Sequence, residues 1–202
     1  MGFKVANVTH VSGERIGGTL SFDHRILEFM IKHRTGWLDS TMRVVTSLGS
    51  FTVLTFVAVV AALVWRKRVG DWTALVLLAL VAAIAWWSSN SLKLAFGRAR
   101  PDLADRLVRA GGYSFPSGHA TQSAAIWGTI ALLAVAQAPS HRRSIWSAAA
   151  TIAVSVGVSR VYLGVHWFTD VIAGWALGAA VVGLAAAAIA SRSRRLVSRR
   201  DP

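Results

Sequence analysis

The stretch YSFPSGHATQSAAIWGTIALLAVAQAP, residues 113–139, decides how this chain is organised. It opens with a histidine-containing turn, Pro116 to His119, and is followed by 21 residues, 120–140, without a charged residue or a histidine. About 20 apolar residues suffice for a helix to cross the hydrocarbon core of a bilayer. The chain therefore places a turn with a titratable side chain, His119, directly at the start of a candidate transmembrane helix.

The same kind of uncharged run occurs four more times along the chain. Three of these runs have at least the same length, at residues 44–65, 72–92 and 171–191, and a shorter one at 144–159 can be extended through 161–163. With 54% hydrophobic residues, 15% charged residues and a mean hydropathy of +0.50, the chain is more apolar than an ordinary soluble domain. We therefore predict an all-α fold, a polytopic transmembrane helical bundle with about five spans.

An amphipathic helix is predicted ahead of the first span. Its apolar residues recur near helical spacing, and charged residues lie between them. The apolar set is Phe22, Ile26, Phe29 and Met30, and the charged set is Asp23, Arg25, Glu28 and Lys32. This pattern favours a helix lying in the membrane interface, although a soluble surface helix shows it too. Gly36 is expected to break the helix before the first span.

The chain divides into three parts by composition. Residues 1–21 hold several glycines and scattered polar residues, and we expect a flexible arm there without the apolar core of a signal peptide. Residues 22–190 are predicted to form the membrane-embedded domain, and residues 191–202 a basic tail. The chain has no cysteine, which excludes disulfide and thiolate chemistry.

The net charge of +13 indicates the class of partner. The basic residues lie in loops and in the tail, between apolar spans, which favours membrane lipid headgroups or a phosphorylated substrate over nucleic acid. If five spans alternate, the clusters at 66–68, 142–143 and in the tail share one side of the membrane. Setting aside basic residues with a proposed chemical role, the positive-inside rule makes that side cytoplasmic.

Three polar islands interrupt the apolar sequence, and alternation of the spans places all of them on the opposite side. They are KLAFGRARP at 93–101, YSFPSGHA at 113–120 and SRVYLGVHWFTD at 159–170. Ionisable residues at membrane depth are costly and usually functional. We therefore expect the islands to form one active site on the extracytoplasmic face of an integral plasma membrane protein.

Three cations in these islands suit an anionic substrate. Lys93, Arg100 and Arg160 stand at span ends and converge if the spans bundle. Arginine offers a planar fork and lysine a point charge, which together fit a tetrahedral dianion such as phosphate. Taken singly, each could equally be a flanking charge that reaches to the interface. The helix start at Ser117 and Gly118 adds free amide groups, a further anion site.

Two histidines and an aspartate supply the candidate catalytic groups. His166 and Asp170 are four residues apart, so on a helix they lie on one face within reach of each other. The aspartate can fix the imidazole tautomer, and the other ring nitrogen can attack phosphorus. His119, from another helix, can then protonate the leaving oxygen. Metal ligation is the competing interpretation, but three surrounding cations make a poor cation site.

Together these residues resemble the complete three-part signature of the type 2 phosphatidic acid phosphatase (PAP2) superfamily. The matching segments are Lys93-x6-Arg100-Pro101, Pro116-Ser117-Gly118-His119 and Ser159-Arg160-x5-His166-x3-Asp170. The resemblance implies a helical bundle and hydrolysis through a phosphohistidine, without a metal or cofactor. It implies His166 as nucleophile, Asp170 as its orienting partner and His119 as acid. It implies a phosphate site made of Lys93, Arg100, Ser117, Gly118 and Arg160.

The predicted function is a lipid phosphatase that removes a terminal phosphate from a lipid phosphate or diphosphate. Five spans plus an amphipathic helix resemble the small undecaprenyl-diphosphate phosphatases of the family, and Arg98, Arg106 and Arg109 add positive charge. Undecaprenyl diphosphate is therefore the first choice of substrate, with phosphatidic acid and phosphatidylglycerol phosphate as alternatives. Lipid phosphotransfer would use the same residues, and a non-catalytic lipid-binding protein would keep the anion pocket. Haloperoxidase activity is disfavoured because those relatives are soluble.

Overall fold

The computed structural model describes residues 17–198, and this part of the chain is helical throughout apart from its connections. The α-helices are α1 (Gly17–Lys32), α2 (Gly36–Ser47), α3 (Phe51–Val69), α4 (Thr73–Phe96), α5 (Gly118–Gln137), α6 (Arg142–Tyr162) and α7 (Phe168–Ser198). Two short 3₁₀ helices, η1 (Leu103–Asp105) and η2 (Pro139–His141), lie in the connections. The predicted all-α class is confirmed.

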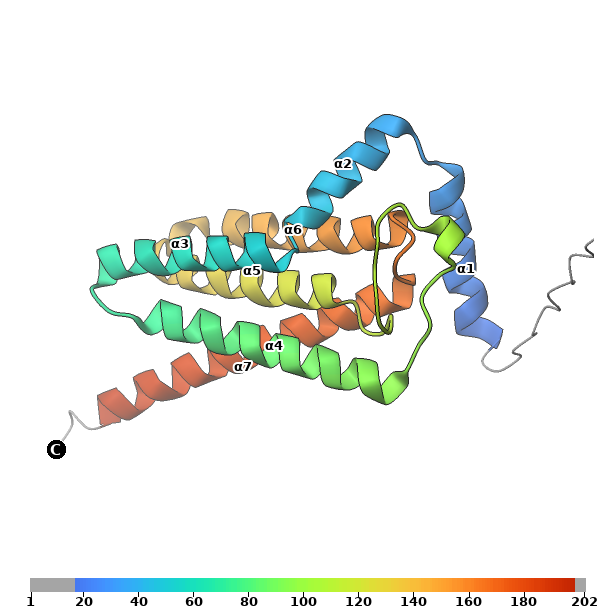
Figure 1. Cartoon of the computed structure of the whole chain (residues 1–202). Coiled ribbons are helices and arrows are strands. Elements are labelled where there is room, and N and C mark those ends of the chain that lie inside the picture. The colour runs from blue at the N-terminus through green and yellow to red at the C-terminus, as the bar shows by residue number, and fades with distance from the viewer. Residues whose placement is uncertain (1–16, 199–202) are drawn as a thin grey trace, which may run out of the picture.

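Helix α5 is the centre of the bundle. It contacts α3, α4, α6 and α7, and these helices run lengthwise beside one another (Figure 1). Helix α1 lies across one end, next to the long connection between α4 and α5 (Figure 1). The turn between α3 and α4 and the described end of α7 lie at the opposite end. The long α4–α5 connection and α1 therefore lie at one end of the bundle, and the α3–α4 turn lies at the other.

Several helices are built to face lipid. Within the described residues, α4, the segment 139–162 and the first 24 residues of α7 are long and apolar enough to cross a membrane. Helices α2 and α3 also qualify as one bent pair. Large apolar side chains are exposed on the outer faces, among them Phe56, Val76, Leu80, Ile84 and Leu184. An apolar surface of this extent, outside a core, belongs against lipid or another protein.

The predicted span over residues 120–140 is helix α5, which is not among the helices that qualify by composition. Its first turns carry Thr121, Gln122 and Ser123, and Thr121 and Ser123 are buried. Its neighbours enclose it, so it needs less apolar surface than a helix that faces lipid. The central helix therefore carries buried polar side chains at the end where the three islands lie.

The predicted first span, residues 44–65, is wrong at its start. Residues 44–47 belong to α2, which is bent by 50° from α3. The Ser50 side chain caps α3 by accepting a hydrogen bond from the Val53 amide. A side chain at Gly49 would collide with atoms of α5 and α6, so the backbone here approaches the bundle closely. The bend brings the end of α2 to the active-site end of the molecule.

Helix α1 exists, but its buried stripe differs from the predicted one. The amphipathic pattern places Asp23 on the polar face, whereas Asp23 and Leu27 are buried against the bundle. Ile26 and Met30 pack against the buried cluster of Ala120, Val161 and Val171, and Phe29 remains exposed. As predicted, the helix ends before Gly36. It begins at Gly17, inside the segment predicted to be an arm, and residues 1–16 lie outside the described residues.

Close packing of α7 on α5 positions the polar end of the bundle. A Cβ atom at Gly174 would lie 2.7 Å from the Ser117 carbonyl oxygen, and one at Gly178 would lie 2.6 Å from the Thr121 carbonyl oxygen. Small residues four apart let two helix backbones approach in this way. The first turns of α5 and α7 are therefore held together, and with them the second and third islands.

Candidate active site

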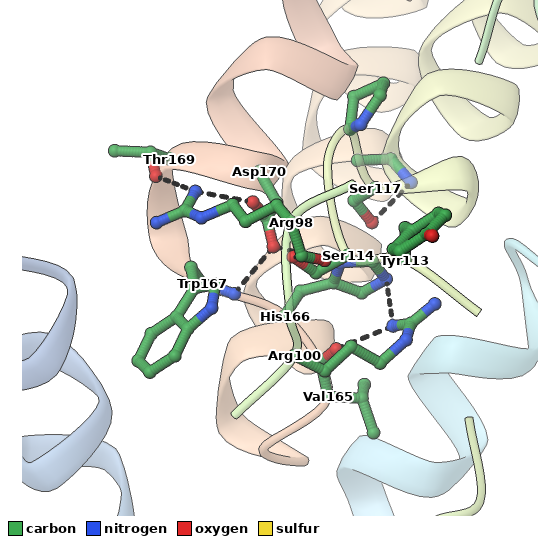
Figure 2. A network of polar contacts seen from close by, with 12 residues as sticks. Arg98, Arg100, Tyr113, Ser114, Ser117, Val165, His166, Trp167, Thr169 and Asp170 are labelled. Atoms are coloured by element: carbon green, nitrogen blue, oxygen red, sulfur yellow. Dashed lines mark hydrogen bonds and ion pairs between the residues drawn. The ribbon is translucent and has the colours of Figure 1, made fainter. Parts of the chain in front are cut away.

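The three polar islands meet at one end of the bundle, as the sequence predicts. The Ser114 amide donates to the Arg98 carbonyl oxygen at 2.8 Å, which ties the first island to the second. The Ser117 amide donates to the Asp170 carbonyl oxygen at 2.9 Å, which ties the second to the third. Figure 2 shows residues of all three islands around His166. Backbone hydrogen bonds thus fix the islands relative to one another.

His166 and Asp170 form the predicted pair, but not on one helix face. His166 lies in the turn between α6 and α7, and Asp170 lies in the first turn of α7. One Asp170 oxygen, Oδ2, is 3.3 Å from His166 Nδ1 and accepts a hydrogen bond from the Trp167 amide at 3.0 Å. His166 is 2% exposed and Asp170 0%. The pair is therefore buried, and the Trp167 amide fixes the Asp170 carboxylate.

The hydrogen bonds of His166 select its tautomer. Arg100 Nη1 is 2.9 Å from His166 Nε2 (Figure 2). A guanidinium can only donate, so Nε2 must carry the lone pair. The proton then lies on Nδ1 and is donated to Asp170. This leaves Nε2 as the nitrogen that faces the cations, which is the tautomer required of a histidine nucleophile.

The electrostatic surroundings keep His166 neutral. Burial lowers the pKa of His166 well below its ordinary value, and the nearby Arg100, Arg160 and Lys93 lower it further. The proton is disfavoured because the charged imidazole would lose its hydration and face three positive charges. At neutral pH the ring is therefore unprotonated on Nε2 and available as a nucleophile.

Each of the three predicted phosphate-binding cations is held by uncharged groups. Lys93 Nζ donates to the carbonyl oxygens of Tyr113 at 3.1 Å and Pro116 at 2.6 Å. Arg100 donates to the carbonyl oxygens of Gly111, Gly112 and Val165, the last at 2.7 Å. Carbonyl oxygens position a cation without cancelling its charge. The charge therefore remains available to an anion.

Arg160 is the most deeply placed of the three. It is 6% exposed, and its Nη1 donates to Thr46 Oγ1 at 2.8 Å. Its buried Nε has no hydrogen-bond partner among the described residues. A buried donor without a partner costs about 1–3 kcal/mol, more when charged. An anion that accepted this hydrogen bond would recover that cost.

The start of α5 carries the remaining predicted residues. His119 is half-buried and lies within electrostatic range of His166 and of all three cations. The Ser117 hydroxyl is fully buried and caps the helix by accepting from the Ala120 amide at 3.5 Å. Gly118 lies at the mouth of a cavity. The first-turn amides have no partners within the helix, so this end offers an anion backbone donors and the His119 ring.

An apolar cavity of about 620 Å³ opens at this point. It runs between α3, α4 and α5, and Lys93, Gly118 and His119 line one end of it. Most of its wall consists of apolar side chains such as Leu54, Leu75, Leu78, Ala79 and Ile126. A cavity of this size with polar groups at one end fits a ligand that has a charged head and an apolar body.

Three residues at the site were not predicted from the sequence, namely Thr46, Asp23 and Thr169. Thr46 binds Arg160, and no pattern in the sequence marks it. Asp23 and Thr169 bind each other, with Thr169 Oγ1 donating to Asp23 Oδ2 at 2.6 Å. One signal was available for Asp23, because it occupies the apolar stripe formed with Ile26, Leu27 and Met30. A lone carboxylate in such a stripe indicates a buried partner.

Of the three arginines offered as extra positive charge for a diphosphate, one is paired with carboxylates, which is a correction. Arg98 forms ion pairs of 2.6 Å with Asp23 and with Asp170. Arg106 donates to the carbonyl oxygens of Pro101 and Ala110. Arg109 is exposed. Arg98 therefore adds no free positive charge for a diphosphate, whereas Arg106 and Arg109 keep theirs.

Acidic and histidine side chains do not gather into a metal-binding group. No cluster of three or more His, Asp or Glu residues with suitable placement occurs in residues 17–198. The carboxylate closest to the candidate nucleophile, Asp170, already binds Arg98 and His166.

Both the sequence and the fold have relatives among known proteins. The model of the PAP2 superfamily matches residues 71–194. Phosphatidylglycerophosphatase B of Bacillus subtilis is 37% identical over 177 residues, 78% of this chain and 78% of that protein. Undecaprenyl-diphosphatase of Sulfolobus acidocaldarius is 47% identical over 66 residues, 33% of this chain and 29% of that protein. The crystal structure of a transmembrane PAP2 type phosphatidylglycerolphosphate phosphatase from Bacillus subtilis has a TM-score of 0.82 at 32% identity, covering 87% of this chain and 88% of its own.

Proposed function

Because this chain belongs to the PAP2 superfamily, we propose that it is an integral membrane lipid phosphatase whose substrate is phosphatidylglycerol phosphate. The observation that carries the proposal is the meeting of two features at one place. The His166–Asp170 pair stands among Lys93, Arg100 and Arg160, and the apolar cavity begins at Lys93 and His119. A phosphate head and a lipid tail would occupy these two features in one binding event.

The reaction follows from the tautomer of His166. Nε2 attacks phosphorus, a phosphorus–nitrogen bond forms and the bond from phosphorus to the lipid oxygen breaks. Protonated His119 gives its proton to the leaving oxygen. Water then attacks the phosphohistidine, with His119 accepting a proton, and releases inorganic phosphate. Asp170 balances the positive charge that His166 acquires during the first step.

The three cations stabilise the charge on the transferring phosphoryl group. Its equatorial oxygens carry spread negative charge in the transition state, and donors already in position pay no reorganisation cost at that moment. Binding of the phosphate would supply the missing acceptor for Arg160 Nε. It would also draw Arg100 Nη1 away from His166 Nε2, which frees the nucleophile.

Two observations support a glycerophospholipid as the substrate. Ser89 and Asn90 line the cavity about one helical turn from Lys93, and the buried Ser89 hydroxyl has no partner among the described residues. Polar groups just beneath the phosphate site that are themselves uncharged suit the ester oxygens of a glycerolipid better than the charged inner phosphate of a diphosphate. In addition, the relative that aligns over 78% of both chains is a phosphatidylglycerophosphatase. Undecaprenyl diphosphate is the second candidate, supported by the 66-residue match to an undecaprenyl-diphosphatase.

A substrate panel tests the proposal directly. Purified protein in detergent and EDTA is assayed for phosphate release from phosphatidylglycerol phosphate, phosphatidic acid and undecaprenyl diphosphate. We expect the highest kcat/KM with phosphatidylglycerol phosphate, and inhibition by orthovanadate, which mimics the five-coordinate phosphorus. A higher kcat/KM with undecaprenyl diphosphate would reverse the order of substrates. Loss of activity in EDTA with recovery on adding a divalent metal would contradict the anion-site mechanism, and transfer to a labelled acceptor without phosphate release would indicate phosphotransfer.

A substitution in the cavity separates tail binding from chemistry. Ala79 lines the cavity, so Ala79→Phe should fill part of it. We expect KM to rise for a long-chain lipid phosphate and to stay near the parent value for p-nitrophenyl phosphate. Leu80→Phe, on the exposed face of the same helix and outside the cavity lining, is the matched control. Equal effects of the two variants on the lipid substrate would remove the cavity from the binding site.

The active-site end is proposed to face the extracytoplasmic side. The basic clusters at 66–68 and 142–143 and the described end of α7 lie at the opposite end of the bundle (Figure 1), where the positive-inside rule favours cytoplasm. The natural chain has no cysteine, so single cysteines report cleanly. On intact cells, an impermeant maleimide should label Asp102→Cys and not Lys67→Cys. Labelling of Lys67→Cys alone would invert the orientation.

A further inference from the structure

A chain of buried charges extends from the candidate nucleophile to helix α1. Asp170 Oδ2 faces His166, and Asp170 Oδ1 accepts from Arg98 Nη1 at 2.6 Å. The other end of the same guanidinium, Nη2, donates to Asp23 Oδ2 at 2.6 Å. Figure 2 shows the part of this chain that joins Thr169, Arg98 and Asp170. Four side chains from three segments thus connect His166 to a residue more than a hundred positions earlier in the chain.

Thr169 forms hydrogen bonds to both Arg98 and Asp23 and so holds the chain of charges in place. Its hydroxyl accepts from Arg98 Nη1 at 2.7 Å and donates to Asp23 Oδ2 at 2.6 Å, and its amide donates to Asp23 Oδ1 at 2.9 Å. Both Asp23 oxygens are therefore engaged, one by the backbone of α7 and one by Arg98 and Thr169. These hydrogen bonds tie Asp23 to Arg98 and to Thr169, the residue next to Asp170, and not to the substrate site itself.

The burial of Asp23 shows that it is not a surface residue of an interfacial helix. Asp23 is 0% exposed, like Asp170. An ionised carboxylate is retained in such a place only when paired and hydrogen-bonded. Arg98 alone serves two buried carboxylates, so the group of Asp23, Arg98 and Asp170 carries one net negative charge. That charge stands beside the ring that becomes positive when His166 attacks phosphorus.

We propose that Asp23 is a positioning residue for the phosphatase reaction. Asp23 holds Arg98 and Thr169 where they fix the Asp170 carboxylate, so that Oδ2 faces His166 Nδ1. This inference rests on the proposed function, because it assigns Asp23 a part in that same reaction. It also gives α1 a role in the active site, beyond that of a helix resting on the membrane.

The physical reason lies in the geometry of Arg98. With Asp23 in place, the guanidinium is held at both ends, and only Nη1 is offered to Asp170. Without the Asp23 charge, Arg98 has one carboxylate partner left and is free to turn its fork toward it, since bidentate pairing is favoured. A bidentate pair would engage both Asp170 oxygens and compete with His166 Nδ1 for Oδ2. The imidazole would then lose its orientation and its counter-charge.

Asp23→Asn is the first test, because it keeps the size of the side chain and removes the charge. We expect kcat to fall roughly 10- to 100-fold, by analogy with losing the outer hydrogen-bond partner of a metal ligand, while KM stays near the parent value. Glu28→Gln is the matched control, since Glu28 is an exposed carboxylate on the same helix. Arg34→Gln is a second control, because Arg34 anchors the α1–α2 connection to the Tyr162 and Asp105 carbonyl oxygens. Both controls should keep the parent kcat, although Arg34→Gln should lower the melting temperature.

A double-mutant cycle separates positioning from general loss of structure. If Asp23 acts through Asp170, then Asp23→Asn should reduce kcat little further when Asp170 is already Asn. A defect in folding would instead multiply with the Asp170→Asn defect. An unchanged kcat in Asp23→Asn, or the same fold loss in both backgrounds, would overturn the proposal. Failure of the parent protein to release phosphate would overturn the proposed function instead, so the two failures are distinguishable.

Thr169→Val keeps the test decisive if Asp23→Asn does not fold. The substitution removes the hydroxyl that bridges Arg98 and Asp23 and leaves the amide hydrogen bond to Asp23 in place. We expect a smaller fall in kcat than for Asp23→Asn, with KM unchanged and with the effect lost in the Asp170→Asn background. A parent-like kcat in Thr169→Val, or a loss that persists unchanged when Asp170 is Asn, would contradict the proposal.

Discussion

His166 stands between two charged regions that are organised in opposite ways. On one side, Arg98 is paired with the carboxylates of Asp23 and Asp170. On the other side, Arg100 is held by backbone carbonyl oxygens and by His166 itself, and among the described residues it pairs with no carboxylate. Two arginines only two positions apart therefore have different kinds of partner, and these partners decide which guanidinium keeps an unpaired positive charge.

The difference supports the proposal that His166 serves as nucleophile next to so much charge. The carboxylate region supplies one net negative charge behind Nδ1, while the cation region supplies uncompensated positive charge in front of Nε2. A neutral imidazole is favoured before the substrate arrives, as the lowered pKa of His166 indicates. Once a phosphate dianion occupies the cation region, positive charge on the ring becomes far less costly.

The largest effect is expected from substitution of His166 or Asp170, because these residues lie where the two charged regions meet. His166→Ala should abolish turnover with a melting temperature near that of the parent, because the group serves chemistry and not the core. Asp170→Asn should lower kcat roughly 10⁴-fold, as when a triad aspartate loses its charge. Both are measured as steady-state phosphate release. Substantial activity in His166→Ala would contradict the covalent mechanism.

His119 should be sensitive to the leaving group, unlike the rest of the cation region. General acids contribute roughly 10²- to 10⁴-fold, so His119→Ala should lower kcat/KM by that order with a lipid monophosphate, whose alkoxide leaves poorly. With p-nitrophenyl phosphate, whose leaving group needs no proton, the loss should be far smaller. The ratio of the two losses is the measurement. Equal losses would leave His119 as a phosphate ligand only.

The arginines of the cation region should respond to geometry as well as charge. Arg100→Lys and Arg160→Lys keep the charge and lose the planar fork. We expect kcat/KM to fall roughly 10²- to 10³-fold, the cost of one lost donor to a charged transition state, and by similar factors for aryl and lipid substrates. Parent-like activity in Arg160→Lys would mean that a point charge suffices there and that the Nε donor is not used.

The smallest effect concerns stability and pH. The folded state keeps His166 neutral, whereas the unfolded chain binds a proton at its ordinary pKa of about 6.5. The unfolded state therefore binds more protons below that pH, and stability falls as the pH falls, by at most about 1.4 kcal/mol per pH unit from this group. Melting temperatures of the parent and of His166→Gln, compared between about pH 7.5 and about pH 5.5, should show a shallower decline in the variant. An equally steep decline would assign the pH dependence to other groups.

Much of the bundle could be predicted from the chain because lipid imposes a simple length rule. Uncharged runs of about 20 residues mark the spans, and the helices α3 to α7 occupy them. The rule fails at residues 44–50, where an apolar run continues through a bend that Ser50 and Gly49 create. A run without charged residues shows that the segment is favourable in lipid. It does not show in which direction the helix axis runs.

The residues of the three islands could be grouped into one predicted site because phosphoryl chemistry needs particular side chains at particular spacings. The structure brings the three islands to one end of the bundle, but the sequence could not show which groups would be neutralised there. From the sequence, Arg98 counted as additional positive charge for a diphosphate, and its partners made it part of the carboxylate region. Whether a basic residue lacks a carboxylate partner depends on contacts between segments that are distant in the sequence.

The amino-acid sequence by itself determined the helical class, the polar end of the bundle and the residue types capable of phosphoryl chemistry, because composition and spacing are local properties of the chain. Only the tertiary structure decided the tautomer of His166, the pairing of Arg98 and the recruitment of Asp23 from α1. Each of these depends on which groups from distant parts of the chain come within hydrogen-bonding distance. A buried charge is governed by its nearest partners, and the fold alone chooses those partners.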